Sequence, residues 1–124
     1  MANIFELPIP KTAVSTIDGA ATLTTAQTIN GLILSTPTAA RAHTTPTATE
    51  LLTALDNKFV GASFELNYRN TSAGAYAITL TAGSGVTVIG TATVAQNATA
   101  RFMAVVTGVA TPAITFYRIG TGTV

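Results

Sequence analysis

Apolar and polar residues alternate along much of the second half of the chain. In residues 59–69, Phe64, Leu66 and Tyr68 fall on one side of an extended chain. Charged residues such as Glu65 fall on the other side, and this period of two is typical of a β-strand with one buried face. The same pattern predicts further strands at 75–81, 86–89, 90–95, 98–107 and 113–119. The residues expected in the core are Phe64, Leu66, Ile78, Leu80, Phe102 and Phe116.

The first half of the chain has shorter apolar runs that are separated by turn residues. We expect short strands at 13–17, 21–24 and 31–35. The pairs Asp18-Gly19 and Asn30-Gly31 lie between these strands, and such pairs favour the positive φ angles of hairpin turns. Residues 36–46 contain two prolines and several threonines, so an extended loop is expected there.

One segment has a helical pattern. Thr47 and Glu50 have the spacing of a capping box, in which each side chain accepts a hydrogen bond from the main-chain N–H of the other residue. The three leucines that follow Glu50 form an apolar stripe. This pattern predicts a helix over about residues 47–56. A helix of about ten residues is too short to be stable alone, so we expect it to pack on the strands.

Short strands with frequent turn signals predict an all-β fold, either a sandwich or a small barrel. We expect an antiparallel β-sandwich of the jelly-roll type with one short helix, formed by residues 12–124 as a single domain. Residues 1–11 are expected to form an extended N-terminal arm, because Pro8 and Pro10 exclude a regular helix or a central strand. This arm packs either on its own domain or on a neighbouring subunit. Its apolar residues are Ile4, Phe5, Leu7 and Ile9.

The composition favours a protein that is buried in an assembly. Charged residues make up 9% of the chain, hydrophobic residues make up 48%, and the mean hydropathy is +0.47. The longest strongly apolar run, residues 102–106, is much shorter than the roughly 20 residues of a membrane-spanning helix. The net charge is +1 and the basic residues are dispersed, which argues against binding to nucleic acid or to a membrane surface. The absence of cysteine and of a signal-peptide pattern is typical of synthesis in a reducing cytoplasm.

Few residues could carry chemistry. His43 is the only histidine, and the five acidic residues are far apart in sequence. No catalytic, metal or cofactor pattern results, and His43 is expected to lie in a loop without a role. The glycine-rich residues 82–85 are followed by a β-branched run, so a plain turn is preferred to a phosphate-binding loop. The sequons that begin at Asn70 and Asn97 are also assigned to turns. Arg69 and Arg101 are expected either in cross-strand ion pairs or in contacts between subunits.

Three segments, in order, resemble a known class of viral proteins. They are GLILSTPTAARAHTTPTATELLTAL (31–55), VGASFELNYRNTSAGAYAITLTAGSGVTVIGTATV (60–94) and FYRIGTG (116–122). Their order and texture resemble the small capsid decoration, or cement, proteins of tailed bacteriophages and other large DNA viruses. The resemblance implies a β-rich fold, a homotrimer, and attachment to the major capsid protein on the virion surface. It assigns no role to any individual residue.

Composition and resemblance lead to the same hypothesis, a homo-oligomeric cement protein that stabilises the joints between major capsid subunits. The alternative is a receptor- or glycan-binding β-sandwich module of a viral fibre or tail, for which Tyr68, Tyr76 and Tyr117 could act as stacking platforms. An enzyme is not supported, because the sequence offers no nucleophile and base in a recognisable pattern.

Overall fold

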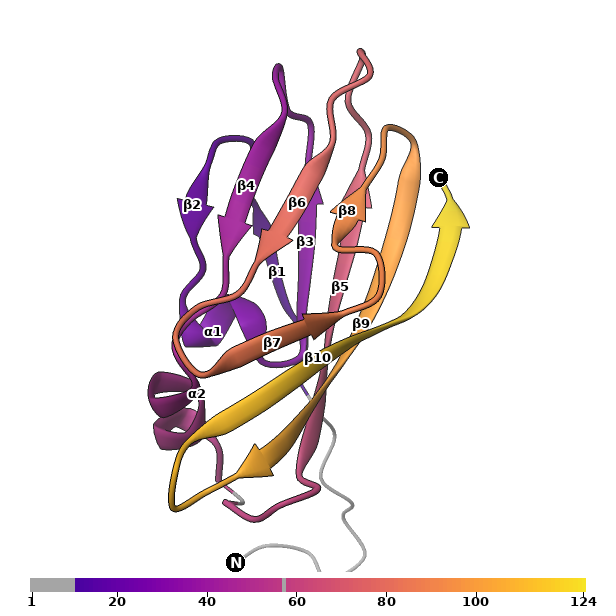
Figure 1. The fold of residues 1–124 in the computed structure, drawn as a ribbon. Helices are drawn as coiled ribbons and strands as arrows, with labels where there is room; N and C mark the ends of the chain where they lie inside the picture. Colours follow the sequence, from indigo (N-terminus) through magenta and orange to yellow (C-terminus); the bar gives the residue numbers. More distant parts are fainter. Residues whose placement is uncertain (1–10, 57) are drawn as a thin grey trace, which may run out of the picture.

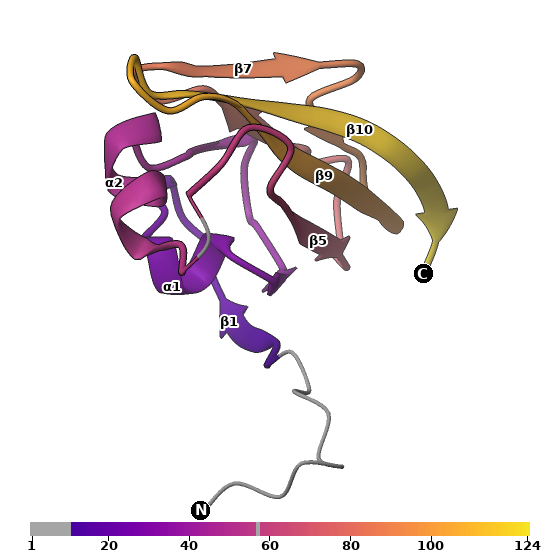
Figure 2. The same cartoon turned by 90° about the horizontal axis from the view of Figure 1, so that it is seen from below.

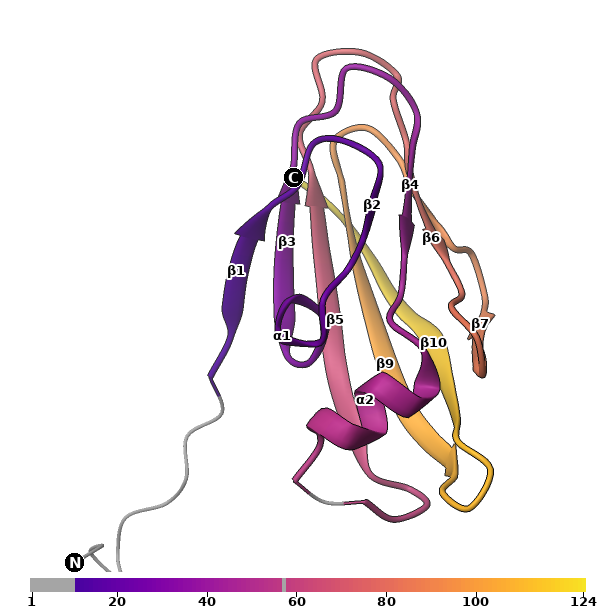
Figure 3. The ribbon, with the colours of Figure 1, turned by 90° about the vertical axis from the view of Figure 1, so that its left-hand side faces the viewer.

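Ten strands and two short helices make up the part of the chain that the structure, a computed structural model, describes: residues 11–56 and 58–124. The strands form two sheets that lie face to face as layers (Figures 1 and 3). The large sheet contains, in spatial order, β1 (Ala13–Thr16), β3 (Gly31–Ser35), β5 (Ser63–Asn70), β9 (Ala98–Gly108), β10 (Ala113–Thr123) and β7 (Val86–Ile89). The small sheet contains β2 (Ala21–Thr22), β4 (Arg41–Thr44), β6 (Ile78–Thr81) and β8 (Thr93–Val94). The helices are α1 (Thr25–Thr28) and α2 (Ala48–Ala54), and neither is long and apolar enough to cross a membrane.

The first six strands alternate between the two sheets. β1, β3 and β5 are parallel neighbours in the large sheet, and β2, β4 and β6 are parallel neighbours in the small sheet. A tight hairpin cannot join parallel neighbours, so the chain crosses to the opposite layer between them. It therefore winds around the core in successive coils, each of which adds one strand to each layer. α1 and α2 lie in the connections that lead from the small sheet back to the large sheet.

The expected antiparallel jelly roll is not confirmed in this part of the chain, because the pairing is mixed. Antiparallel pairing is found at β5–β9, β9–β10 and β6–β8, whereas β7 is parallel to β10. The chain reverses at Asp18-Gly19, but the reversed strand β2 joins the opposite layer instead of pairing with β1. Turn residues predict a change of direction, and they do not predict which strand will be the hydrogen-bonding partner. The fold is mostly β, with two mixed sheets and two short helices instead of one.

The additional helix, α1, begins with a capping box. The Gln27 N–H donates to Thr24 Oγ1 at 3.2 Å, and the Thr24 N–H donates to Gln27 Oε1 at 2.9 Å. Asn30 then adopts a positive φ of 53°. A Cβ atom on Gly31 would lie 1.8 Å from the main-chain oxygen of Gln27, so only glycine fits there. The Asn30-Gly31 pair therefore forms the exit from a helix and not the expected hairpin.

Several predicted elements are confirmed and others are shifted. The strands at 31–35 and 86–89 and the helix that Thr47 and Glu50 cap lie where the pattern placed them. The expected loop at 36–46 contains β4, because its prolines flank this strand without interrupting it. β5 begins only at Ser63, and Phe59 and Val60 are exposed in the turn before it.

The core lies between the two layers and includes all six residues that alternation predicted. Phe64 and Phe116 make an edge-to-face contact with ring centroids 5.7 Å apart, and Tyr68 and Phe102 make a second one at 6.3 Å. In the strand predicted at 75–81, alternation with Ile78 and Leu80 would also place Tyr76 inward, but Tyr76 lies in the loop before β6 and is exposed. The buried apolar side chains come from both sheets and from α2, so one core joins the layers.

A buried asparagine fastens the end of β5 to the small sheet. The Nδ2 atom of Asn70 donates to the main-chain oxygens of Tyr76 (2.8 Å) and Val94 (3.0 Å). Its Oδ1 atom accepts from the Ser72 N–H at 3.0 Å. One amide thus binds three main-chain groups, and its hydrogen bonds to Val94 and Ser72 are buried.

We expect Asn70→Ala to lower the free energy of unfolding by about 2 kcal/mol, because it leaves buried main-chain groups without partners. Urea denaturation followed by circular dichroism measures this loss. Asn67→Ala, on the same strand but on the outer face, is the matched control and should change stability by less than about 0.5 kcal/mol. Equal losses for the two variants would contradict the proposed role of the Asn70 amide.

Candidate interaction surface

The outer face of the large sheet brings together residues that are far apart in the sequence. Phe64 and Leu66 of β5 point into the core. Glu65 and Asn67 alternate with them along the strand and therefore point outward. In the register with β9, Asn67 lies opposite Arg101 and Arg69 lies opposite Thr99. The two arginines predicted as interface residues therefore share this face.

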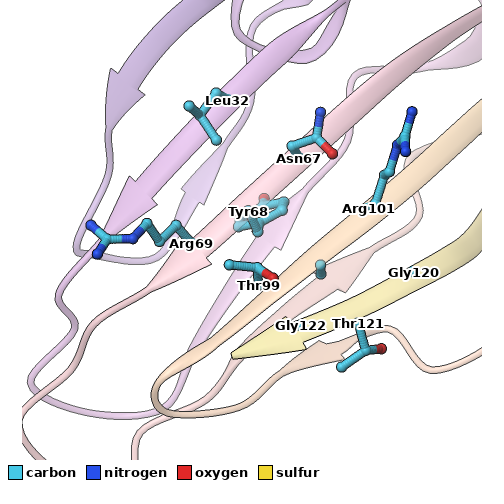
Figure 4. Close-up of a pocket in the computed structure, with 10 residues that line it drawn as sticks. Leu32, Asn67, Tyr68, Arg69, Thr99, Arg101, Gly120, Thr121 and Gly122 are labelled. Atoms are coloured by element: carbon cyan, nitrogen blue, oxygen red, sulfur yellow. The ribbon is translucent and has the colours of Figure 1, made fainter. Parts of the chain in front are cut away.

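A groove of about 380 Å³ crosses this face between β3 and β10 (Figure 4). Two glycines of β10 produce it: Gly120 lies opposite Arg101 and Gly122 lies opposite Thr99, so neither position carries a side chain. The main residues that line the groove are Leu32, Asn67, Arg69, Thr99, Arg101, Gly120 and Gly122. The floor is mostly backbone and apolar atoms, and the rim carries guanidinium groups.

The two arginines of the groove differ in their partners. Arg101 Nε donates to Glu65 Oε1 at 3.1 Å, and Arg101 Nη2 donates to the same oxygen. This confirms the expected cross-strand ion pair for Arg101. Because the pair is exposed, water screens the attraction and the pair contributes little to stability. Arg69 is exposed at the end of β5. A guanidinium group in this position can donate to carboxylate or carbonyl oxygens of a partner.

Beside the groove, the same face carries an apolar strip. Tyr117 of β10 lies between Met103 of β9 and Ile89 of β7 in the sheet register. Tyr117 and Ile89 are 38% and 49% exposed, and the next outward residue, Ile119, is also exposed. Sequence reasoning missed this strip because β7 and β10 are distant in the chain, and their parallel pairing was not predicted. Exposed apolar residues that cluster in this way are typical of interaction sites.

His43 does not lie in a loop. It belongs to β4, is fully buried, and bridges the two layers. Its Nδ1 atom lies 3.0 Å from the Tyr68 hydroxyl, and its Nε2 atom lies 3.0 Å from the main-chain oxygen of Gly19. A carbonyl oxygen can only accept, so Nε2 carries the proton and Nδ1 accepts from Tyr68. Burial lowers the pKa of His43, and the neutral ring is a structural bridge within the core.

The remaining candidate sites have structural explanations. Residues 84–85 form a turn with Gly85 at φ 77°, and strand β7 follows, so the helix that a phosphate-binding loop needs is not there. Asn97 occupies a turn with φ 55°, whereas Asn70 is the buried asparagine of β5 and not a turn residue. In the described residues, no cluster of three or more histidine, cysteine or acidic side chains could hold a metal ion.

The other predicted interface residues, Ile4, Phe5, Leu7 and Ile9, lie outside the described residues. Of the tyrosines considered for glycan stacking, Tyr68 is buried, Tyr76 lies in the loop before β6, and Tyr117 belongs to the apolar strip. No protein family model, curated protein or solved structure matches the chain.

Proposed function

We propose that this protein is a homo-oligomeric capsid decoration protein that binds the outer surface of a viral shell and stabilises the joints between major capsid subunits. The observation that carries the proposal is the outer face of the large sheet, where the arginine-rimmed groove adjoins the apolar strip. Aromatic residues, methionine and arginine are enriched in protein interfaces, and Tyr117, Met103 and Arg69 supply all three here. In this proposal, residues 12–124 act as a single β-sandwich domain.

The proposed mechanism is noncovalent. Burial of the apolar strip against capsid subunits removes apolar area from water, and the low charge of the chain limits the cost of desolvating polar groups. A protein that binds the assembled lattice more tightly than the separate subunits shifts the equilibrium towards the assembled lattice. The partners are the major capsid protein and further copies of this chain, as a homotrimer. The protein is made in the host cytoplasm and is located on the virion.

The proposal is tested by adding the purified protein to capsids that lack it and measuring bound protein after sedimentation. Tyr117→Glu places a charge in the apolar strip, and we expect it to weaken binding at least about tenfold, as for a central interface residue. Val109→Glu is the matched control, because Val109 is equally exposed but lies in the turn between β9 and β10. Saturable binding that Tyr117→Glu weakens and Val109→Glu leaves unchanged supports the proposal, and no binding to any capsid preparation contradicts it.

The alternative, a receptor- or glycan-binding module, predicts a different result in the same preparation. Tyr76 and Tyr117 lie on separate elements, so each would have to act as a single stacking residue. A glycan array with the purified protein distinguishes the two functions. Specific glycan binding that Tyr76→Ala removes, together with no capsid binding, would favour the alternative.

A further inference from the structure

The first strand of the large sheet has an open edge. β1 pairs with β3 on one side, and in residues 11–56 and 58–124 no strand pairs with its other side. The Ile17 N–H donates to Leu34 O in β3, so by alternation Val14 and Thr16 direct their N–H and C=O groups towards the open side. β1 carries no proline and no charge, the usual devices that protect an edge strand from pairing. This edge is therefore suited to accept another strand.

An apolar hollow lies on the inner side of the same edge. It has a volume of about 520 Å³ and is bounded by β1, α1 and the end of α2. Figures 2 and 3 show α1 beside the inner side of β1. The apolar residues of the lining are Ala13, Ala26, Ile29 and Ala54, and its one charged residue is Lys11. A strand added next to β1 would direct every second side chain over this hollow.

The ten residues that precede the described chain have the composition of such a strand. In an extended chain, Phe5, Leu7 and Ile9 present their N–H groups on one edge and their apolar side chains on one face. Pro8 and Pro10 alternate with these three residues along the chain. Proline has no backbone N–H, so the N–H groups that this segment lacks would all belong to the opposite edge. Glu6 falls on the opposite face. The segment can thus form strand hydrogen bonds through one edge only. Phe5, Leu7 and Ile9 supply both the N–H groups of that edge and the apolar side chains.

We propose that residues 4–10 of a second copy of this chain add a strand to the open edge of β1 and cover the hollow with Phe5, Leu7 and Ile9. A copy cannot readily place its own segment there, because the chain would have to reverse within Pro10-Lys11-Thr12, which has no glycine, asparagine or aspartate. The seven residues of the segment span about 23 Å when extended and continue directly into Lys11 of the donor copy, so the two copies would meet at this edge. The proposal specifies how copies associate and does not require capsid binding.

Cysteine cross-linking tests the proposal, because the chain contains no cysteine of its own. Leu7→Cys protein and Ala26→Cys protein are mixed and oxidised, and we expect a disulfide-linked pair that neither protein forms alone. Ile4→Cys, on the opposite face of the segment, is the matched control and should cross-link to Ala26→Cys at least about tenfold less. No linked pair in the mixture overturns the proposal. A Leu7→Cys/Ala26→Cys double variant that links only within one chain also overturns it.

Substitution by proline tests which edge of residues 4–10 pairs with β1. Leu7→Pro removes an N–H from the edge that should pair, whereas Glu6→Pro removes one from the edge that already contains prolines. By light scattering, we expect Leu7→Pro to raise the dissociation constant between copies at least about tenfold and Glu6→Pro to leave it unchanged. Equal effects contradict strand addition. Because no capsid is present in either experiment, failure of the proposed capsid function leaves both results unaffected.

Discussion

Replacing Phe102 by alanine is expected to lower the free energy of unfolding by about 3–5 kcal/mol, the largest loss of any single truncation considered. Phe102 is fully buried in β9, at the centre of the large sheet. Its ring makes an edge-to-face contact with Tyr68, and the guanidinium carbon of Arg118 lies 5.4 Å from the centroid of the Phe102 ring. Truncation therefore removes apolar burial, an aromatic contact and a cation–π contact, and it leaves a cavity between the layers.

Phe59→Ala is the matched control, because it makes the same chemical change at a residue that is 57% exposed. Chemical denaturation monitored by circular dichroism should show a loss of less than about 1 kcal/mol for this variant. A loss below about 1 kcal/mol for Phe102→Ala would mean that β9 presents its other face to the core. That outcome would contradict the described register, since a slip of one residue exchanges the two faces of a strand.

The strands and their buried faces could be predicted from the sequence because alternation is a local property. Phe64 and Leu66 alternate with polar residues, and both are buried as expected. The order of the strands could not be predicted in this way. The successive coils differ in length. Ala13 pairs with Gly31 and Gly31 pairs with Leu66, and the number of residues between the second pair is about twice that between the first pair. Coils of different length produce no repeat of fixed length in the sequence. The parallel winding therefore could not be recognised in the way that alternation reveals a strand.

The candidate surface was predictable only in part. Arg69 and Arg101 were selected as interface residues, and alternation with the pairing of β5 and β9 brings them to one face. The groove between them depends on Gly120 and Gly122, whose position opposite β9 follows a bulge near Arg118. A bulge changes the phase of a strand, so outward-facing positions beyond it cannot be assigned by counting. The capping box of α1, by contrast, was present in the sequence as Thr24 and Gln27 and could have been recognised.

His43 is where sequence reasoning failed most clearly, and we expect His43→Ala to lower the free energy of unfolding by about 3 kcal/mol. The variant loses a buried ring and leaves the Tyr68 hydroxyl and the Gly19 carbonyl without their partners. A lone histidine between prolines has no apolar periodicity that would place it in a core. Its burial follows from β4, a strand that exists because β2 and β6 flank it in the small sheet.

The same histidine should make stability depend on pH in a range where no other side chain of the chain has its ordinary pKa. Burial lowers the pKa of His43 in the folded protein, whereas in the unfolded chain it stays near 6.5. Between these two values the unfolded state binds more protons, so stability is fully present above about pH 6.5 and falls as the pH decreases towards the folded pKa. The slope is at most about 1.4 kcal/mol per pH unit, since one proton is involved.

Denaturant titrations at several pH values between about pH 5 and pH 8 measure this slope, because that range includes the pKa of histidine in the unfolded chain. Two variants distinguish the titration of His43 from a general loss of stability. Tyr68→Phe removes the hydroxyl donor but keeps the histidine, so it should lower stability and retain the pH dependence. His43→Ala removes the only side chain whose ordinary pKa lies near neutrality, so the stability of this variant should be nearly constant over this range. A wild-type protein whose stability is flat from pH 8 to pH 5, or a His43→Ala variant that keeps the slope, would contradict a buried neutral histidine between the layers.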